Sequence, residues 1–192
     1  SGIQANKLFI DSYNQKWIIP RRTFSLIVFD DNGSLENTAD DEVKTLNSST
    51  GNGNIFTSEI KCMTQDLDRE MWFGTDKGIG YFDYDTMAYT PWDVFQGIYI
   101  YDVELIDDHQ MWIATREKGI YYYDIQSGEI VNYHTEAMGT KVLSDNHVYD
   151  IYKDSKERLW VATNNGLNLM RPGQEAFDMF YYNQNDRTQL AG

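Results

Sequence analysis

The sequence predicts an all-β fold assembled from four similar units, and three features of its 192 residues indicate this. First, a Trp-containing segment recurs as MWFGT at 71–75, MWIAT at 111–115 and LWVAT at 159–163. Second, the apolar runs are short and rich in Tyr, Ile, Val, Phe and Trp, which favours strands over helices. Third, the composition is 41% hydrophobic and 15% aromatic, which is typical of a folded globular chain.

The repeat keeps a constant internal layout. Trp17, Trp72, Trp112 and Trp160 are separated by 55, 40 and 48 residues. Twelve positions before each Trp stands an aliphatic residue, and six positions before it stands an aspartate in three copies: Asp11, Asp66 and Asp154. The third copy has Ile106 at that place, followed by Asp107. Periods of this length are typical of solenoids, arrays and propellers.

Each copy divides into four short strands. The first is the Ile60–Gln65 run and its equivalents, and the second carries the Trp. The third strand starts after a turn glycine (Gly78, Gly119, Gly166), which we expect to adopt positive φ, and the fourth contains an aromatic residue (Tyr89, Tyr133, Phe180). Four antiparallel strands per repeat predict the blade of a β-propeller.

We therefore expect one β-propeller region over 1–192, with blades at about 3–57, 58–97, 98–146 and 147–192, and we expect it to be a fragment of a larger propeller. The regular strand position of the tryptophans predicts that three of them are mostly buried between blades: Trp72, Trp112 and Trp160. Each shares a face with a small residue two positions later, because side chains alternate along a strand: Gly74, Ala114 and Ala162.

The charge balance excludes some partners. Thirty acidic and sixteen basic residues give a formal charge of −14, which disfavours nucleic acid and anionic membrane surfaces. Cys62 is the sole cysteine, so the chain has no internal disulfide. No stretch approaches a membrane-spanning helix and no signal peptide opens the chain. These features leave a cytoplasmic protein or a mature or excised piece of a longer one.

Two segments carry a family resemblance: DSKERLWVATNNGLNLM at 154–170 and DLDREMWFGTDKGIGYFD at 66–83. They resemble the two-component regulator propeller repeat, and the likeness covers most of the chain from residue 58 onward. The first copy departs from the pattern, with Ile19 at the small position and Ser25 at the turn glycine. Its segment DSYNQKWIIPRR at 11–22, followed by VFDDNGSLENTADD at 28–41, is also similar to propellers of a surface component of the type IX secretion machinery.

The first resemblance implies an extracytoplasmic sensor, periplasmic or at the cell surface, in a hybrid histidine kinase that responds to oligosaccharides. The implied partners are an oligosaccharide and further blades or domains of the same parent protein, and the kinase domain would lie outside this chain. The second resemblance implies a surface docking platform. A propeller lyase or hydrolase is a third hypothesis, which needs a carboxylate pair or a metal constellation that the sequence does not display.

We expect no catalysis and no cofactor. His109, His134 and His147 occupy different repeat positions, and no Cys or His pair has zinc-site spacing. No nucleophile elbow and no glycine-rich phosphate loop is present. The stretch 30–42 holds six acids and no base, which makes Asp30, Asn32, Asp40 and Asp41 a weak calcium candidate, although a solvated hairpin explains it more simply.

A ligand would be expected at one face of the blades. When strands follow one another in a sheet, the turn between the second and third strands shares a face with the link to the next blade. Polar turn residues there can hydrogen-bond to sugar hydroxyls, with Tyr residues nearby for stacking. The candidates are Arg21, Arg22, Lys77, Arg116, Glu117, Asn164 and Asn165. The simpler alternative is that these turns are polar only because they are exposed.

Overall fold

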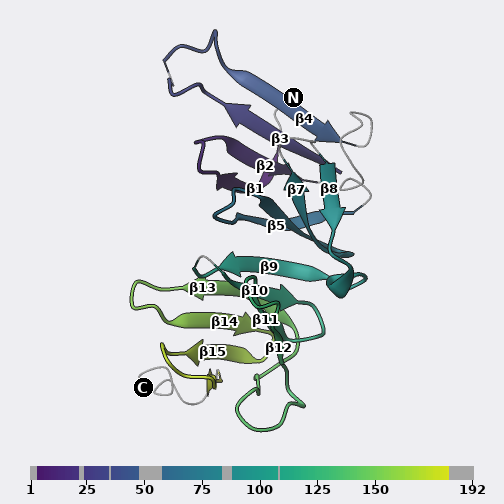
Figure 1. Cartoon of the computed structure of the whole chain (residues 1–192), viewed down its shortest axis with the longest axis vertical. Helices are drawn as coiled ribbons and strands as arrows, with labels where there is room; N and C mark the ends of the chain where they lie inside the picture. The colour runs from purple at the N-terminus through teal and green to yellow at the C-terminus, as the bar shows by residue number, and fades with distance from the viewer. Residues whose placement is uncertain are drawn as a thin grey trace. The chain divides into compact units, whose positions relative to one another are not determined.

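The computed structural model describes residues 4–21, 24–34, 36–47, 58–83, 88–107 and 109–181. It confirms the all-β prediction, because the strands form four antiparallel four-stranded sheets in which sequence neighbours pair (Figure 1). The chain divides into two compact units, residues 1–97 and 98–192. The sheets lie within the four stretches expected for the blades. That these stretches form a single propeller region stays a prediction.

The described residues of the first unit form two sheets and one short 3-10 helix. The strands of the first sheet are β1 Ala5–Ile10, β2 Lys16–Pro20, β3 Ser25–Asp30 and β4 Glu42–Asn47. Those of the second are β5 Ile60–Gln65, β6 Met71–Thr75, β7 Gly78–Asp83 and β8 Ala88–Pro91, followed by η2 Asp93–Phe95. Trp17 of β2 packs against Phe73 and Phe82 of the second sheet, with ring centroids 6.0 and 5.9 Å away. The core of this unit therefore lies between its two sheets.

The second unit repeats this arrangement. Its strands are β9 Ile100–Leu105, β10 Gln110–Thr115, β11 Ile120–Asp124, β12 Ile130–Tyr133, β13 Val148–Lys153, β14 Leu159–Thr163, β15 Gly166–Met170 and β16 Asp178–Phe180. The first strands of the two sheets, β9 and β13, are linked where Asp102 Oδ2 accepts a hydrogen bond from the Ile151 backbone N–H at 3.2 Å. Trp112 packs in the core between the sheets with Val148 and Ile151.

The tryptophan prediction is confirmed at two positions and only partly at the third. Trp72 is 8% exposed and Trp112 is 5% exposed. Trp160 is half-buried. Its ring contacts Phe180, with centroids 6.4 Å apart, and the Arg158 guanidinium. These partners cover less of the indole than a facing sheet does around Trp112.

The aspartate that precedes Trp by six positions has a structural role that the sequence analysis did not recognise. The indole N–H donates to the carboxylate in three sheets, from Trp17 to Asp11 at 2.8 Å, from Trp72 to Asp66 at 2.7 Å and from Trp160 to Asp154 at 2.9 Å. The same carboxylates accept backbone N–H bonds of their own turns. One side chain thus closes the turn and satisfies a largely buried donor.

The turn glycines have the expected positive φ, at 140° for Gly78, 75° for Gly119 and 119° for Gly166. They also lie close to other backbone. A Cβ would meet a carbonyl oxygen at 2.8 Å in Gly78, 2.0 Å in Gly119 and 2.4 Å in Gly166. Glycine is therefore required at these positions for two reasons: the positive φ, and the lack of space for a side chain.

Candidate functional site

In the second unit, two turns that carry predicted ligand-binding residues are each hydrogen-bonded to the residue just before the first strand of their own sheet. Arg116 and Glu117 are exposed in the β10–β11 turn, and Asn164 and Asn165 in the β14–β15 turn. The Arg116 backbone N–H donates to the Tyr99 carbonyl at 3.0 Å. The Asn164 backbone N–H likewise donates to the His147 carbonyl at 2.9 Å. Each turn is therefore tied to the residue just before its first strand.

An aromatic cluster joins these two turns, and we call it the tyrosine platform: Tyr99, Tyr101, His147 and Tyr149. Ring centroids are 4.9 Å apart for Tyr99 and Tyr101, 5.3 Å for Tyr101 and His147, and 4.7 Å for His147 and Tyr149. His147 Nε2 lies 3.3 Å from the Tyr101 hydroxyl. Tyr149 is 46% exposed, so the platform is open to solvent.

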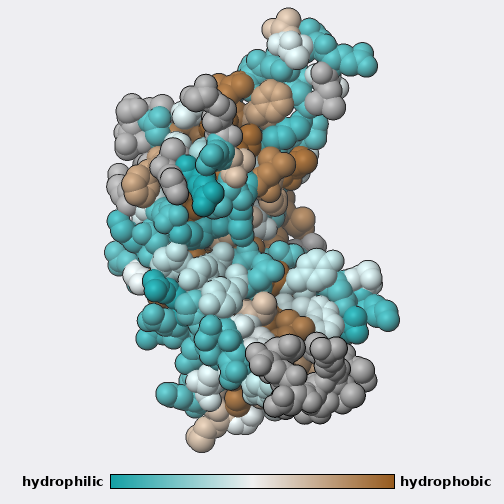
Figure 2. All heavy atoms as spheres, turned by 180° about the vertical axis from the view of Figure 1, so that it is seen from behind, coloured by the Kyte–Doolittle hydropathy of each residue, from teal (hydrophilic) through white to brown (hydrophobic). Residues whose placement is uncertain are grey.

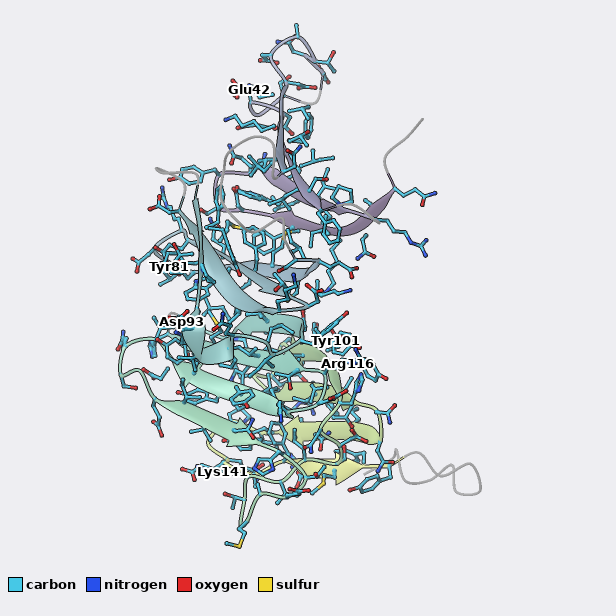
Figure 3. The ribbon with its side chains drawn as sticks, turned by 90° about the vertical axis from the view of Figure 1, so that its right-hand side faces the viewer. Glu42, Tyr81, Asp93, Tyr101, Arg116 and Lys141 are labelled. Carbon is cyan, nitrogen blue, oxygen red and sulfur yellow. The ribbon has the colours of Figure 1, made fainter. Side chains whose placement is uncertain are left out.

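The predicted polar residues contact this platform. The Arg116 guanidinium lies over the Tyr99 ring at 5.5 Å and 3.7 Å from the Glu117 carboxylate. The Tyr149 hydroxyl donates to Asn164 Oδ1 at 3.3 Å. Figure 3 shows Tyr101 and Arg116 on the same side of this unit. The structure therefore brings Arg116, Glu117 and Asn164 together around aromatic rings.

A sequence signal for the platform existed. Tyr99 and His147 stand thirteen positions before their tryptophans, and Tyr101 and Tyr149 stand eleven before them. The first and second copies have no aromatic residues at these places. The platform is thus a property of the third and fourth repeats, which an alignment of the repeats could have shown.

The remaining candidates belong to the first unit. Arg21 is exposed and its backbone N–H donates to the Gln4 carbonyl at 2.7 Å. Lys77 is exposed and borders a cleft of about 320 Å³ that Tyr89 and Trp92 also line. Arg22 lies outside the described residues. A shared surface of these residues with Arg116 and Asn164 stays a prediction.

Two of the four residues of the weak calcium candidate, Asp30 and Asn32, use their side chains in hydrogen bonds within the protein, whereas Asp41 Oδ1 is buried without a partner among the described residues. Asp30 accepts hydrogen bonds from the Gln15 amide at 3.0 Å and the Asn32 backbone N–H at 2.9 Å, and these bonds lower the pKa of its carboxyl. The Asn32 side chain donates to the Asp40 carbonyl, and Asp41 is half-buried. Within the described ranges, no three His, Cys, Asp or Glu side chains are grouped as a metal site requires.

Acidic side chains line the strands beside the platform. On β9, burial and, to a smaller extent, the charges of Asp102 and Asp150 raise the pKa of the Glu104 carboxyl to about 7, against the opposing charge of Lys153. The neutral form of this carboxyl is therefore favoured in the folded protein up to near neutral pH.

We expect Glu104→Gln to stabilise the protein above neutral pH. An unfolded Glu has a pKa of about 4.3, so the folded state binds the extra proton between that value and the folded pKa, and stability is lost as pH rises through this window. Urea unfolding at about pH 5 and about pH 8 should show a loss for the wild type, relative to the variant, on the order of 1–3 kcal/mol. Glu117→Gln, which changes an exposed carboxylate, is the control, and an equal effect there would contradict the prediction.

The sheets define a class of protein, because sequential four-stranded antiparallel sheets at this period are the blades of a β-propeller. Residues 142–165 match the family model of the two component regulator propeller. The resemblance seen in the sequence is thereby confirmed, with the match lying in the fourth repeat.

Three similar proteins place these repeats in context. The chain is 29% identical over 171 residues to histidine kinase P4 of Formosa agariphila, covering 83% of this chain and 12% of that relative. The extracellular domain of BT4673 from B. thetaiotaomicron, assigned to a hybrid two component system, superposes with a TM-score of 0.69 at 18% identity. That match covers 97% of this chain and 23% of BT4673.

PorZ, a surface component of the type-IX secretion system of Porphyromonas gingivalis, superposes with a TM-score of 0.65 at 17% identity, over 98% of this chain and 27% of PorZ. At these identities the structural matches show the fold. The chain spans about an eighth of the histidine kinase and about a quarter of the two solved structures. Across the part of the chain that the structure describes, no helix is long and apolar enough to cross a membrane.

Proposed function

We propose that this chain is part of the extracytoplasmic sensor of a bacterial two-component signalling receptor and recognises an oligosaccharide without catalysing a reaction. The observation that carries the proposal is the tyrosine platform, bordered by Arg116 in the third repeat and by Asn164 in the fourth, which matches the two component regulator propeller. The similarity to a histidine kinase supports the receptor context. An extracytoplasmic location, periplasmic or at the cell surface, is supported by the extracellular domain of BT4673.

The chemistry of the platform suits a sugar. The face of a pyranose ring carries C–H groups that pack on aromatic rings, while its hydroxyls need both donors and acceptors. Arg116 supplies donors, Glu117 supplies acceptors and the Asn164 amide supplies both. Binding would shift the receptor toward one conformation only to the extent that this conformation binds the sugar more tightly.

Exposed apolar positions support further blades or domains of the same parent protein as partners. Leu8 is 61% exposed, whereas the residues at the same repeat position, Met63, Val103 and Ile151, are at most 8% exposed. Figure 2 shows apolar atoms at the surface of the first unit. The half-buried Trp160 is a second such position. Facing blades would bury these side chains as they do in the other repeats.

The alternative function is a docking platform on the cell surface. The similarity to PorZ over almost the whole chain favours it, and the fold alone does not separate the two functions. A docking platform would bind protein through the exposed turns and would not respond to glycans.

The test of the proposal is a titration with neutral and acidic oligosaccharides, followed by calorimetry. We expect a double variant, Arg116→Ala with Asn164→Ala, to weaken binding about tenfold or more, because a donor and a bidirectional amide are lost from the site. Lys156→Ala, which removes an exposed cation from the β13–β14 turn, is the matched control and should bind normally. Unchanged affinity in the double variant would place the site elsewhere.

A further inference from the structure

The third sheet lacks the bond that satisfies its tryptophan in the other three. Ile106 stands where Asp11, Asp66 and Asp154 accept the indole N–H. Asp107 still closes the turn, accepting the backbone N–H groups of His109 at 3.1 Å and Gln110 at 2.9 Å. The turn is therefore preserved while the carboxylate that would reach the indole is lost.

The indole N–H of Trp112 has no acceptor among the described residues, although the side chain is 95% buried, with 5% exposed. Its ring is held by Tyr122, Tyr133 and Phe177, with centroids at 5.2, 5.5 and 6.1 Å. The indole nitrogen is not one of the buried side-chain nitrogen or oxygen atoms that lack a partner among the described residues, so this donor is accessible although most of the ring is buried. The indole is thus a fixed donor without an acceptor in the part of the chain that the structure describes.

Trp112 and Ile106 line the same cleft, which lies between the two sheets of the second unit and measures about 440 Å³. This volume falls within the range of about 300–1,000 Å³ that small-molecule sites occupy. Tyr122 and Val131, both partly buried, contribute further apolar lining. The donor therefore stands beside an apolar wall of a cleft large enough for a small ligand.

The charges around the cleft are balanced. Three cations and three carboxylates line it: Lys141, Lys153, Arg171, Glu129, Glu157 and Glu175. Lys153 Nζ donates to the Ile106 carbonyl at 2.7 Å and to Glu157 at 2.8 Å. Lys141 makes no ion pair within the described ranges. The carboxylates would repel an anion, and the basic side chains would repel a cation. A hydroxyl group both donates and accepts hydrogen bonds, so it can bind to both kinds of side chain.

We propose that this cleft is a saccharide-binding site that takes a neutral, hydroxyl-rich ring, one of whose oxygens accepts the Trp112 indole N–H. The glycan class rests on the proposed function, but the site is distinct from the tyrosine platform. Ring C–H groups pack on Tyr122, Val131 and Ile106. Hydroxyls donate to the glutamates and accept from the indole and Lys141. In the third repeat, an oxygen of the bound sugar takes the place of the aspartate that accepts the indole N–H in the other repeats.

The direct test follows the indole ¹⁵N–¹H resonance of Trp112 in the full chain, assigned by its disappearance in Trp112→Phe. The probes are glucose, galactose, mannose, cellobiose and lactose, with glucuronate and glucosamine as charged comparators. We expect at least one neutral sugar to shift this resonance saturably, more strongly than either charged sugar. Trp112→Phe, which keeps a ring but loses the donor, should weaken that binding about fivefold. If no neutral sugar shifts the resonance, or only glucuronate does, the proposal is wrong.

Ile106→Asp is the decisive variant, because it restores the aspartate of the other repeats. The new carboxylate should accept the indole N–H, shift its resonance without ligand, keep or raise Tm, and abolish the response to the sugar. Sugar binding equal to the wild type in this variant would overturn the proposal. The double variant Arg116→Ala with Asn164→Ala should still bind the sugar in this cleft. Failure of the proposed platform site and failure of the proposed cleft site therefore give different experimental results.

Discussion

Replacing Trp112 with Ala is expected to lower the free energy of unfolding by about 3–5 kcal/mol, as truncation of a buried aromatic residue does. The residue is 5% exposed and packs against Tyr122, Tyr133 and Phe177. Among the described residues the indole N–H has no acceptor to lose, so the effect comes from apolar packing and the cavity left behind. Urea unfolding monitored by circular dichroism measures the change.

Trp160→Ala is the matched comparison for this prediction. The residue holds the same repeat position but is half-buried, so its removal should cost less than half as much through packing. Trp160→Ala also breaks the hydrogen bond to Asp154, which adds to the stability lost in this variant. The difference in stability between the two variants therefore underestimates the difference in packing. Equal losses in the two variants would mean that exposure does not distinguish the two tryptophans and that the core of the second unit is wrongly assigned.

Gly119→Ala is expected to destabilise the protein by about 2–4 kcal/mol, because it combines backbone strain with a steric clash. Its φ is 75°, and a Cβ would lie 2.0 Å from the Tyr133 carbonyl oxygen and 3.1 Å from His134 Cβ. Both neighbours belong to the end of β12 and the link beyond it, so the backbone itself has to move. Thermal unfolding should show a clear drop in Tm.

Gly128→Ala isolates the conformational part of this effect. Gly128 has the same φ of 75°, but nothing lies within 4 Å of its Cβ position. Its replacement should therefore cost only about 1–2 kcal/mol, the penalty of a left-handed conformation. If the two variants lose the same stability, the close approach at Gly119 contributes nothing.

Much of the fold could be predicted because it is encoded locally. Alternating apolar residues, polar turns and glycines at constant offsets are properties of a few neighbouring residues, and the strands at 71–75 and 159–163 follow from them. The structure differs from the sequence-based predictions where the burial of a side chain depends on residues of another sheet. Trp160 has the sequence context of Trp112, yet it is more exposed because its face lacks an equally extensive cover.

The candidate site was only partly predictable for the same reason. The turn residues Arg116 and Asn164 could be named from their position between strands. Their contacts with Tyr99 and Tyr149 form within single repeats, but the joining of the two pairs through Tyr101 and His147 depends on how the third and fourth repeats lie side by side. The cleft at Trp112 depends on it too, because its walls come from both sheets.

By itself the sequence determined the repeat, the four-stranded sheets, the positive φ of the turn glycines and the resemblance to the two-component regulator propeller. These follow from strand periodicity and turn chemistry, which act over a few residues. Only the tertiary structure decided that an aspartate satisfies the indole in three repeats and that Trp112 is left with an open donor. It also decided that four aromatic rings form one platform. The indole bond depends on the three-dimensional shape of a hairpin, which brings the aspartate and the tryptophan of one repeat to hydrogen-bonding distance. The platform depends on side chains of two different sheets meeting at van der Waals distance, which no single repeat specifies.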